Sequence, residues 1–88
     1  MTHPYGVAIG YNSLSAGYYA VALGYESVAN NSSVVSVGSG DSTKQSYTRR
    51  IINVTDPESN QDAATKNYVD NAIVTAINRI TNADEVSY

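Results

Sequence analysis

Tyrosines are the residues in this sequence whose type and spacing could do chemistry. The chain has eight, with no Phe and no Trp, so every aromatic side chain combines an apolar ring with a polar hydroxyl. Tyr5 and Tyr19 are separated by a 14-residue interval, and so are Tyr11 and Tyr25. Aromatic side chains stacked at such an interval offer contact area to a sugar or a protein, or they brace the fold itself. Both alternatives stay open for the candidate ligand-contact residues, which are Tyr11, Tyr18, Tyr19 and Tyr25.

Catalytic and metal-binding constellations are not evident. His3 is the single histidine, there is no Cys, and Asp84-Glu85 reads as a solvated acidic pair near the end of the sequence. We therefore expect no enzyme activity, no cofactor and no metal site. With five basic residues and a net charge of −3, the sequence does not predict the basic surface that nucleic-acid binding needs. The sequence also lacks the run of about 20 apolar residues that membrane insertion needs.

A 14-residue repeat organises the first half of the chain. Val7-Ala8-Ile9-Gly10 returns as Val21-Ala22-Leu23-Gly24 and again as Val35-Ser36-Val37-Gly38. A unit of this length cannot enclose a core, so successive units must stack on one another as in a solenoid. Two short strands and two turns in each unit would make one coil of a parallel β-roll.

Within each repeat, large aliphatic residues alternate with small ones, which is the period of a β-strand. The glycines at 10, 24 and 38 suit corners that need a positive φ or a close approach of backbone. The small face is either a surface where copies of the roll meet or the filling of a narrow interior. The residues assigned to the core of the roll are the aliphatic ones: Val7, Ile9, Val21, Leu23, Val35 and Val37.

The end of the sequence changes to a helical period. We expect a helix from Ala63 onward, with Asp62 as its N-cap and Asn60 competing for that position. Ile77 widens the apolar stripe, which favours a trimer or a larger bundle over a two-stranded coil. A small chain without disulfides has oligomerisation as its route to stability. The seam of the coiled coil is predicted to consist of Val69, Ile73, Ala76, Ile80 and Ala83.

The 14-residue repeats resemble the head repeats of trimeric autotransporter adhesins, whose consensus is close to S-V-A-I-G-x-x-S-x-A-x-G. The segment that follows the repeats resembles that family's neck. The resemblance implies a homotrimeric, left-handed parallel β-roll head over 1–41, a neck over 42–62 and a parallel trimeric coiled coil over 63–88. The fold class is thus mainly β with a C-terminal α element. The neck residues that carry the resemblance are Arg49, Arg50, Ile51, Asn53, Val54 and Asp62.

The neck arginines are expected to tie adjacent subunits together through carboxylates, because arginine suits a bidentate, partly buried pair. The candidate partners are Asp56, Asp62 and Asp70. The alternative is that one or both arginines point into solvent, where an ion pair contributes only about 0–1 kcal/mol.

A second resemblance covers residues 56–70. Their ending, D-A-A-T-K-N-Y-V-D, is similar to a segment common in bacteriophage tail fibres. We therefore predict a non-enzymatic segment of an extracellular virion tail fibre that attaches to a bacterial surface glycan or receptor. The first alternative is a head-neck-stalk fragment of a bacterial trimeric adhesin at the cell surface or outer membrane, binding host matrix or other cells. The second is a trimerisation and spacer scaffold.

Overall fold

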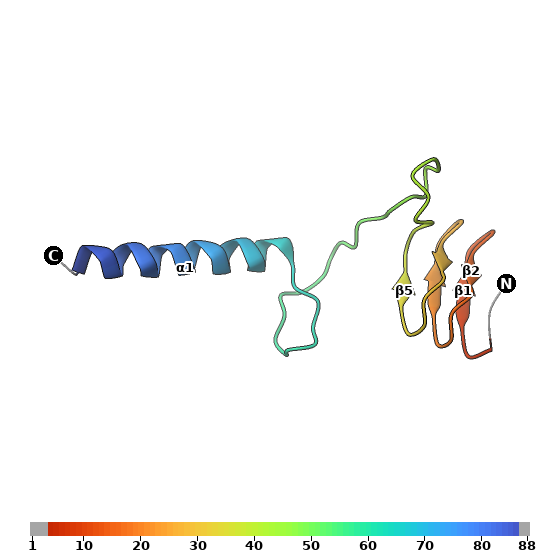
Figure 1. The fold of residues 1–88 in the computed structure, drawn as a ribbon, viewed down its shortest axis with the longest axis horizontal. Helices are drawn as coiled ribbons and strands as arrows, with labels where there is room; N and C mark the ends of the chain where they lie inside the picture. Colours follow the sequence, from red (N-terminus) through yellow and green to blue (C-terminus); the bar gives the residue numbers. More distant parts are fainter. Residues whose placement is uncertain (1–3, 87–88) are drawn as a thin grey trace. The chain divides into compact units, whose positions relative to one another are not determined.

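The computed structural model describes residues 4–86, and side chains as far as residue 82 (Figure 1). The predictions for His3, for Ala83 in the helical seam and for the Asp84-Glu85 side chains lie outside this part. The described chain divides into two compact units, one ending at Arg50 and one beginning at Ile51. Each unit is described by itself.

The first unit is a stack of short parallel strands in two sheets. One sheet has the order β1-β3-β5, made of Val7–Ile9, Val21–Leu23 and Val35–Ser36. The other pairs β2, Leu14–Ser15, with β4, Val28–Ala29.

The register of these strands follows the repeat in the sequence. Val7 pairs with Val21 and Val21 with Val35, so each strand pairs with its equivalent in the next repeat. Leu14 pairs with Val28 at the same step in the second sheet. The predicted stacking of 14-residue coils with two strands each is confirmed. The left hand of the roll and its trimeric state stay predictions.

The interior of the roll is lined by the small face of each strand. Ala20 and Ala22 are fully buried and Ala29 is 1% exposed, and these three form the apolar core. Ser15 and Ser27 are fully buried beside them. The interpretation of the small residues as filling for a narrow interior is correct, and their interpretation as the meeting surface of copies is wrong.

The large aliphatic residues that we assigned to the core lie on the outside instead. The exposed fractions are 45% for Val7, 60% for Ile9, 37% for Leu23 and 66% for Val35. Val21 and Val37 are half-buried. The reason is geometric. A coil this short holds its two sheets so close that mainly Ala, Gly and Ser fit between them, with Val34 packed against this core in the last coil. Alternation alone does not say which face turns inward.

The buried serines satisfy the backbone at the bends of the coil. The Ser13 hydroxyl donates to the Gly10 carbonyl at 2.7 Å, and the Ser27 hydroxyl donates to the Leu23 carbonyl at 2.5 Å. The Ser15 hydroxyl donates to the Ala20 carbonyl at 2.8 Å. Among the described residues no buried side-chain nitrogen or oxygen lacks a partner. Serine therefore gives this interior both the small volume and the hydrogen bonds that it needs.

The bends follow a rule that the sequence does not display. A residue with left-handed backbone, φ between 58° and 70°, recurs at every seventh position, so each coil has two such corners. Glycine adopts this conformation freely, whereas other residues bear strain of about 1–2 kcal/mol. The corner residues are Tyr5, Asn12, Tyr19, Glu26, Ser33 and Gly40.

The repeated glycines serve the close contact between coils. Gly10 has φ +125°, and a Cβ there would lie 2.5 Å from the carbonyl carbon of Gly24. Gly24 has φ +109°. Gly38 does not share the positive φ, but a Cβ on it would collide with the Tyr47 carbonyl oxygen. The expectation of positive φ or close approach is therefore confirmed at all three positions, by different routes.

In its described part, the second unit contains the helix α1, from Lys66 to Val86. The expected start at Ala63 and the Asp62 N-cap are wrong. The Tyr68 N–H donates to the Thr65 hydroxyl oxygen at 3.1 Å, so Thr65 is the N-cap. The Thr65 hydroxyl itself donates to the Asp56 carboxylate at 2.7 Å. Lys66 pairs with Asp70 one turn later at 2.7 Å.

The apolar side of α1 has no covering within its own unit. Val69, Ile73 and Ile80 are 43%, 53% and 64% exposed, and Ile77 beside them is 55% exposed. Their role as a coiled-coil seam stays a prediction, as does that of Ala76. No helix in the described part of the chain is long and apolar enough to cross a membrane.

Adding a methyl group at Gly10 should disrupt the stacking of coils. We expect Gly10→Ala to lower the free energy of unfolding by about 2–4 kcal/mol, because it combines left-handed strain with a backbone clash. Gly40→Ala is the matched control, since Gly40 also has a positive φ but nothing lies within 4 Å of its added Cβ. That change should cost about 1 kcal/mol. Urea unfolding followed by circular dichroism measures both, and equal losses would contradict the close-contact explanation.

Candidate functional site

Two stacked tyrosine pairs stand on the outside of the roll. The rings of Tyr5 and Tyr19 have centroids 5.6 Å apart with an interplanar angle of 21°. The rings of Tyr11 and Tyr25 are 6.0 Å apart at 10°. All four side chains are more than half exposed. The repeat therefore builds two surface ladders in which one ring face of each tyrosine is covered by the tyrosine of the next coil.

Tyr18 joins the first of these ladders from the side. Its ring is tilted by 43° to that of Tyr19, with centroids 6.3 Å apart, and the side chain is 53% exposed. The predicted contact set thus falls into two groups, Tyr18 with Tyr19 and Tyr11 with Tyr25. Tyr5 was not in that set, although its 14-residue spacing from Tyr19 was a signal in the sequence that the two rings would stack. Ligand contact by these side chains stays a prediction.

The last coil is closed by residues 38–49. The backbone N–H groups of Ser39 and Gly40 donate to the carbonyls of Ser46 and Tyr47, at 2.8 and 3.1 Å. Asp41 accepts from the Thr43 N–H and hydroxyl, at 3.0 and 2.7 Å, and these bonds lower the pKa of its carboxyl. The segment thereby forms a compact loop with its own hydrogen bonds.

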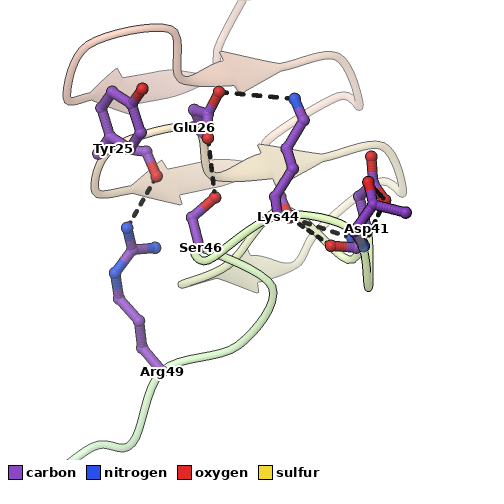
Figure 2. Close-up of polar contacts among 8 residues, drawn as sticks. Tyr25, Glu26, Asp41, Lys44, Ser46 and Arg49 are labelled. Carbon is purple, nitrogen blue, oxygen red and sulfur yellow. Dashed lines mark hydrogen bonds and ion pairs between the residues drawn. The ribbon is translucent and has the colours of Figure 1, made fainter.

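Glu26 anchors this loop to the second coil (Figure 2). The Ser46 hydroxyl donates to one carboxylate oxygen of Glu26 at 3.1 Å, and the Lys44 ammonium lies 3.6 Å from the other. The Glu26 side chain keeps only 20% of its surface exposed. The Glu26 carboxylate therefore holds the end of the roll together.

Arg49 binds within its own chain, and its partners are not carboxylates. Its guanidinium donates to the Tyr25 carbonyl at 2.7 Å (Figure 2). It also donates to the Val37 carbonyl at 2.5 Å and to the Ser27 hydroxyl oxygen at 2.9 Å. The expected partnership with an aspartate of an adjacent subunit concerns contacts between chains and stays a prediction. For Arg49 it would compete with three hydrogen bonds already made. Arg50, the next residue, is exposed.

The remaining neck residues belong to the second unit. Ile51 is 71% exposed and Val54 37%, and Asn53 has a left-handed φ of 63°. Asp62 closes a turn, because its carboxylate accepts the N–H groups of Glu58 and Ser59, each at 3.0 Å. These two bonds to the charged form lower the pKa of the Asp62 carboxyl.

The described residues offer no group of three or more His, Cys, Asp or Glu side chains placed to hold a metal ion. The carboxylates that the first unit does contain are committed to loop closure, as Glu26 and Asp41 are.

Comparison with known families identifies the roll. Residues 4–27 and 15–40 each match the YadA head domain repeat. The first unit carries two copies of this repeat. The match supports a head like that of the trimeric autotransporter adhesins, which is a structural adhesin family and not an enzyme family. It ends at residue 40, so it does not extend to the segment that resembles phage fibres. No curated protein matches the chain.

Acid should open the Asp62 turn only below the ordinary aspartate pKa of 3.8. The folded-state pKa is lowered, so the turn's stabilisation is complete above 3.8 and is lost as the pH falls through the lower folded value. NMR should show the Glu58 and Ser59 amide shifts titrating with the Asp62 carboxyl. Asp62→Asn is the control that removes this titration. A midpoint at or above 3.8 would contradict the assignment.

Proposed function

We propose that residues 4–40 are the head of a homotrimeric, surface-exposed, non-enzymatic fibre of the adhesin type. Residues 42–62 would continue it as a neck and residues 63–88 as a coiled-coil stalk. The observation that carries the proposal is the coincidence of two YadA head repeats with an apolar sheet face that the chain leaves uncovered.

The occupant proposed for that face is a second and a third copy of the same sheet. Val7, Ile9, Leu23 and Val35 project from β1, β3 and β5, and all four are exposed in one chain. Burial is worth about 25 cal/mol per Å² of apolar surface, so association would supply the apolar burial that an interior of Ala and Ser lacks. The helix also leaves an apolar stripe exposed. Identical chains would cover both surfaces at once.

A cell-surface adhesin of a bacterium fits the family match better than the phage tail fibre does. The match covers residues 4–40, whereas the phage hypothesis rests on residues 56–70 alone. We therefore place the fibre outside the cell, as a head-neck-stalk fragment whose partners are host matrix or other cell surfaces. Attachment of a virion to a bacterial surface glycan stays the second hypothesis.

The tyrosine ladders are the proposed contact surface, and their geometry limits how they would bind. Neighbouring rings stack on each other, so each pair covers one ring face of each of its tyrosines. A ligand would meet the ring edges, the hydroxyl groups or the ring faces that the pair leaves open. Three copies on one fibre would strengthen weak individual contacts by avidity. The same stacking also favours a second candidate function, a spacer in which the ladders only brace the coils.

Placing a polar side chain on the aliphatic face should weaken the trimer. We expect Ile9→Gln to raise the concentration at which the trimer dissociates by at least about tenfold, since each of three chains loses buried apolar surface. Ser32→Gln, at an exposed polar position, is the control. Analytical ultracentrifugation measures both variants. A well-folded wild-type monomer, or an unchanged Ile9→Gln trimer, would contradict the proposal.

Truncating the Tyr11–Tyr25 ladder tests adhesion against spacing. The wild-type trimer is screened against surface polysaccharides, host matrix proteins and bacterial cells, together with Tyr11→Ala/Tyr25→Ala and Tyr11→Phe/Tyr25→Phe. If hydroxyls make the contact, both double variants lose binding while the trimer stays intact. Retention by the phenylalanine variant alone would indicate ring contact. Absence of binding by the wild type would leave the spacer function.

A further inference from the structure

The hydrogen bonds between coils follow a fixed rule in the first two coils. The Gly24 N–H donates to the Ile9 carbonyl at 2.7 Å, and the Glu26 N–H donates to the Tyr11 carbonyl at 2.9 Å. Each carbonyl at this corner thus accepts from the residue that lies one repeat and one position further along. Continued by one coil, the rule would have the Tyr25 carbonyl accept from the Gly40 N–H.

The third coil breaks this rule. The Gly40 N–H donates to the Tyr47 carbonyl instead, at 3.1 Å. In the second sheet, the N–H of Leu14 in β2 donates to the carbonyl of Ser27, which lies one repeat less one residue further along the chain. By the same spacing the N–H of Val28 in β4 would donate to the carbonyl of Asp41, but it donates to the Gly38 carbonyl. The backbone of residues 38–40 therefore does not stack on residues 24–26 as the earlier corners stack on each other, although Gly40 keeps a left-handed φ. A regular corner is omitted at this position.

The guanidinium of Arg49 lies where that missing corner would have been. A Cβ on Gly10 would meet the backbone of Gly24, at 2.5 Å from its carbonyl carbon. A Cβ on Gly24 would meet the Arg49 guanidinium, at 3.0 Å from both Cζ and NH1. The side chain also gives the Tyr25 carbonyl the donor that Gly40 would have supplied.

We propose that Arg49 terminates the roll, its planar side chain standing in for the backbone of an omitted corner. One nitrogen binds the carbonyl of the second coil, and the other binds the end of the third coil at Val37 and the buried Ser27 hydroxyl. The cap completes the hydrogen bonding of the last edge and fixes the point at which the chain leaves the head. This role lies within one chain and does not depend on the proposed adhesion.

Arginine has the shape for this role, and lysine does not. A guanidinium holds several N–H donors in one plane, so it can serve carbonyls of two coils at once. An ammonium on a flexible stem is a point charge without that planar fork. Arg50 offers a matched control, because it has the same charge at the adjacent position and its side chain is exposed.

The test is amide hydrogen exchange of the full chain, with Arg49→Ala, Arg49→Lys and Arg50→Ala compared with the wild type. In a solenoid, an effect at the end decays over neighbouring repeats. Both Arg49 variants should speed exchange at Glu26 and Val28 by about tenfold, because they lose hydrogen bonds to a charged group. Exchange at Val7 and Leu14 should stay close to that of the wild type. Arg50→Ala should leave all four amides unchanged.

Three outcomes would overturn the proposal. The first is equal acceleration at Val7 and Glu26 in the Arg49 variants, which would indicate general destabilisation. The second is full protection in Arg49→Lys, which would show that charge alone suffices. The third is the same exchange pattern in the Arg50→Ala and Arg49→Ala variants. If Arg49→Ala does not fold, Arg49→Lys keeps the charge and carries the test.

Discussion

The narrow space between the two sheets of one coil is the constraint on which the rest of the head depends. The first two repeats each form two short strands and two corners, and the space they enclose admits mainly Ala, Gly and Ser. Ala20 and Ala22 are buried there completely, and serine hydroxyls donate to backbone carbonyls of the coil. The roll is therefore held by backbone hydrogen bonds between coils and by close contact of small side chains, with little apolar volume.

Two consequences follow on the outer surface. The large aliphatic residues lie on the outside, where they form an exposed apolar face. Tyrosines at equivalent positions of successive coils must stack, because the register fixes their spacing along the roll. The first consequence supports assembly from identical chains, as in the adhesin heads whose repeat this chain carries. The second gives the surface its stacked pairs of tyrosine rings.

The end of the roll shows how a repeat without a core is closed. A regular solenoid ends in an edge of unpaired backbone groups, with which a strand of another chain can pair. Here a loop of residues 38–48 and the side chains of Glu26 and Arg49 occupy that edge. The Glu26 carboxylate and the Arg49 guanidinium thus close the end of the fold within one chain.

The sequence by itself determined the elements that depend on local period. The 14-residue spacing predicted the strand register, including the pairing of Val7 with Val21, and the heptad period predicted a helix. It did not determine which strand face turns inward, since alternation is symmetrical until the distance between sheets is known. It also misplaced the helix N-cap, because Asp62 bonds to the turn behind it while Thr65 has the geometry to cap. The partners of Arg49 lie far away in the chain, as its bond to the Tyr25 carbonyl shows. Only the tertiary structure decided them, because the omitted corner that Arg49 fills exists only once the coils have stacked.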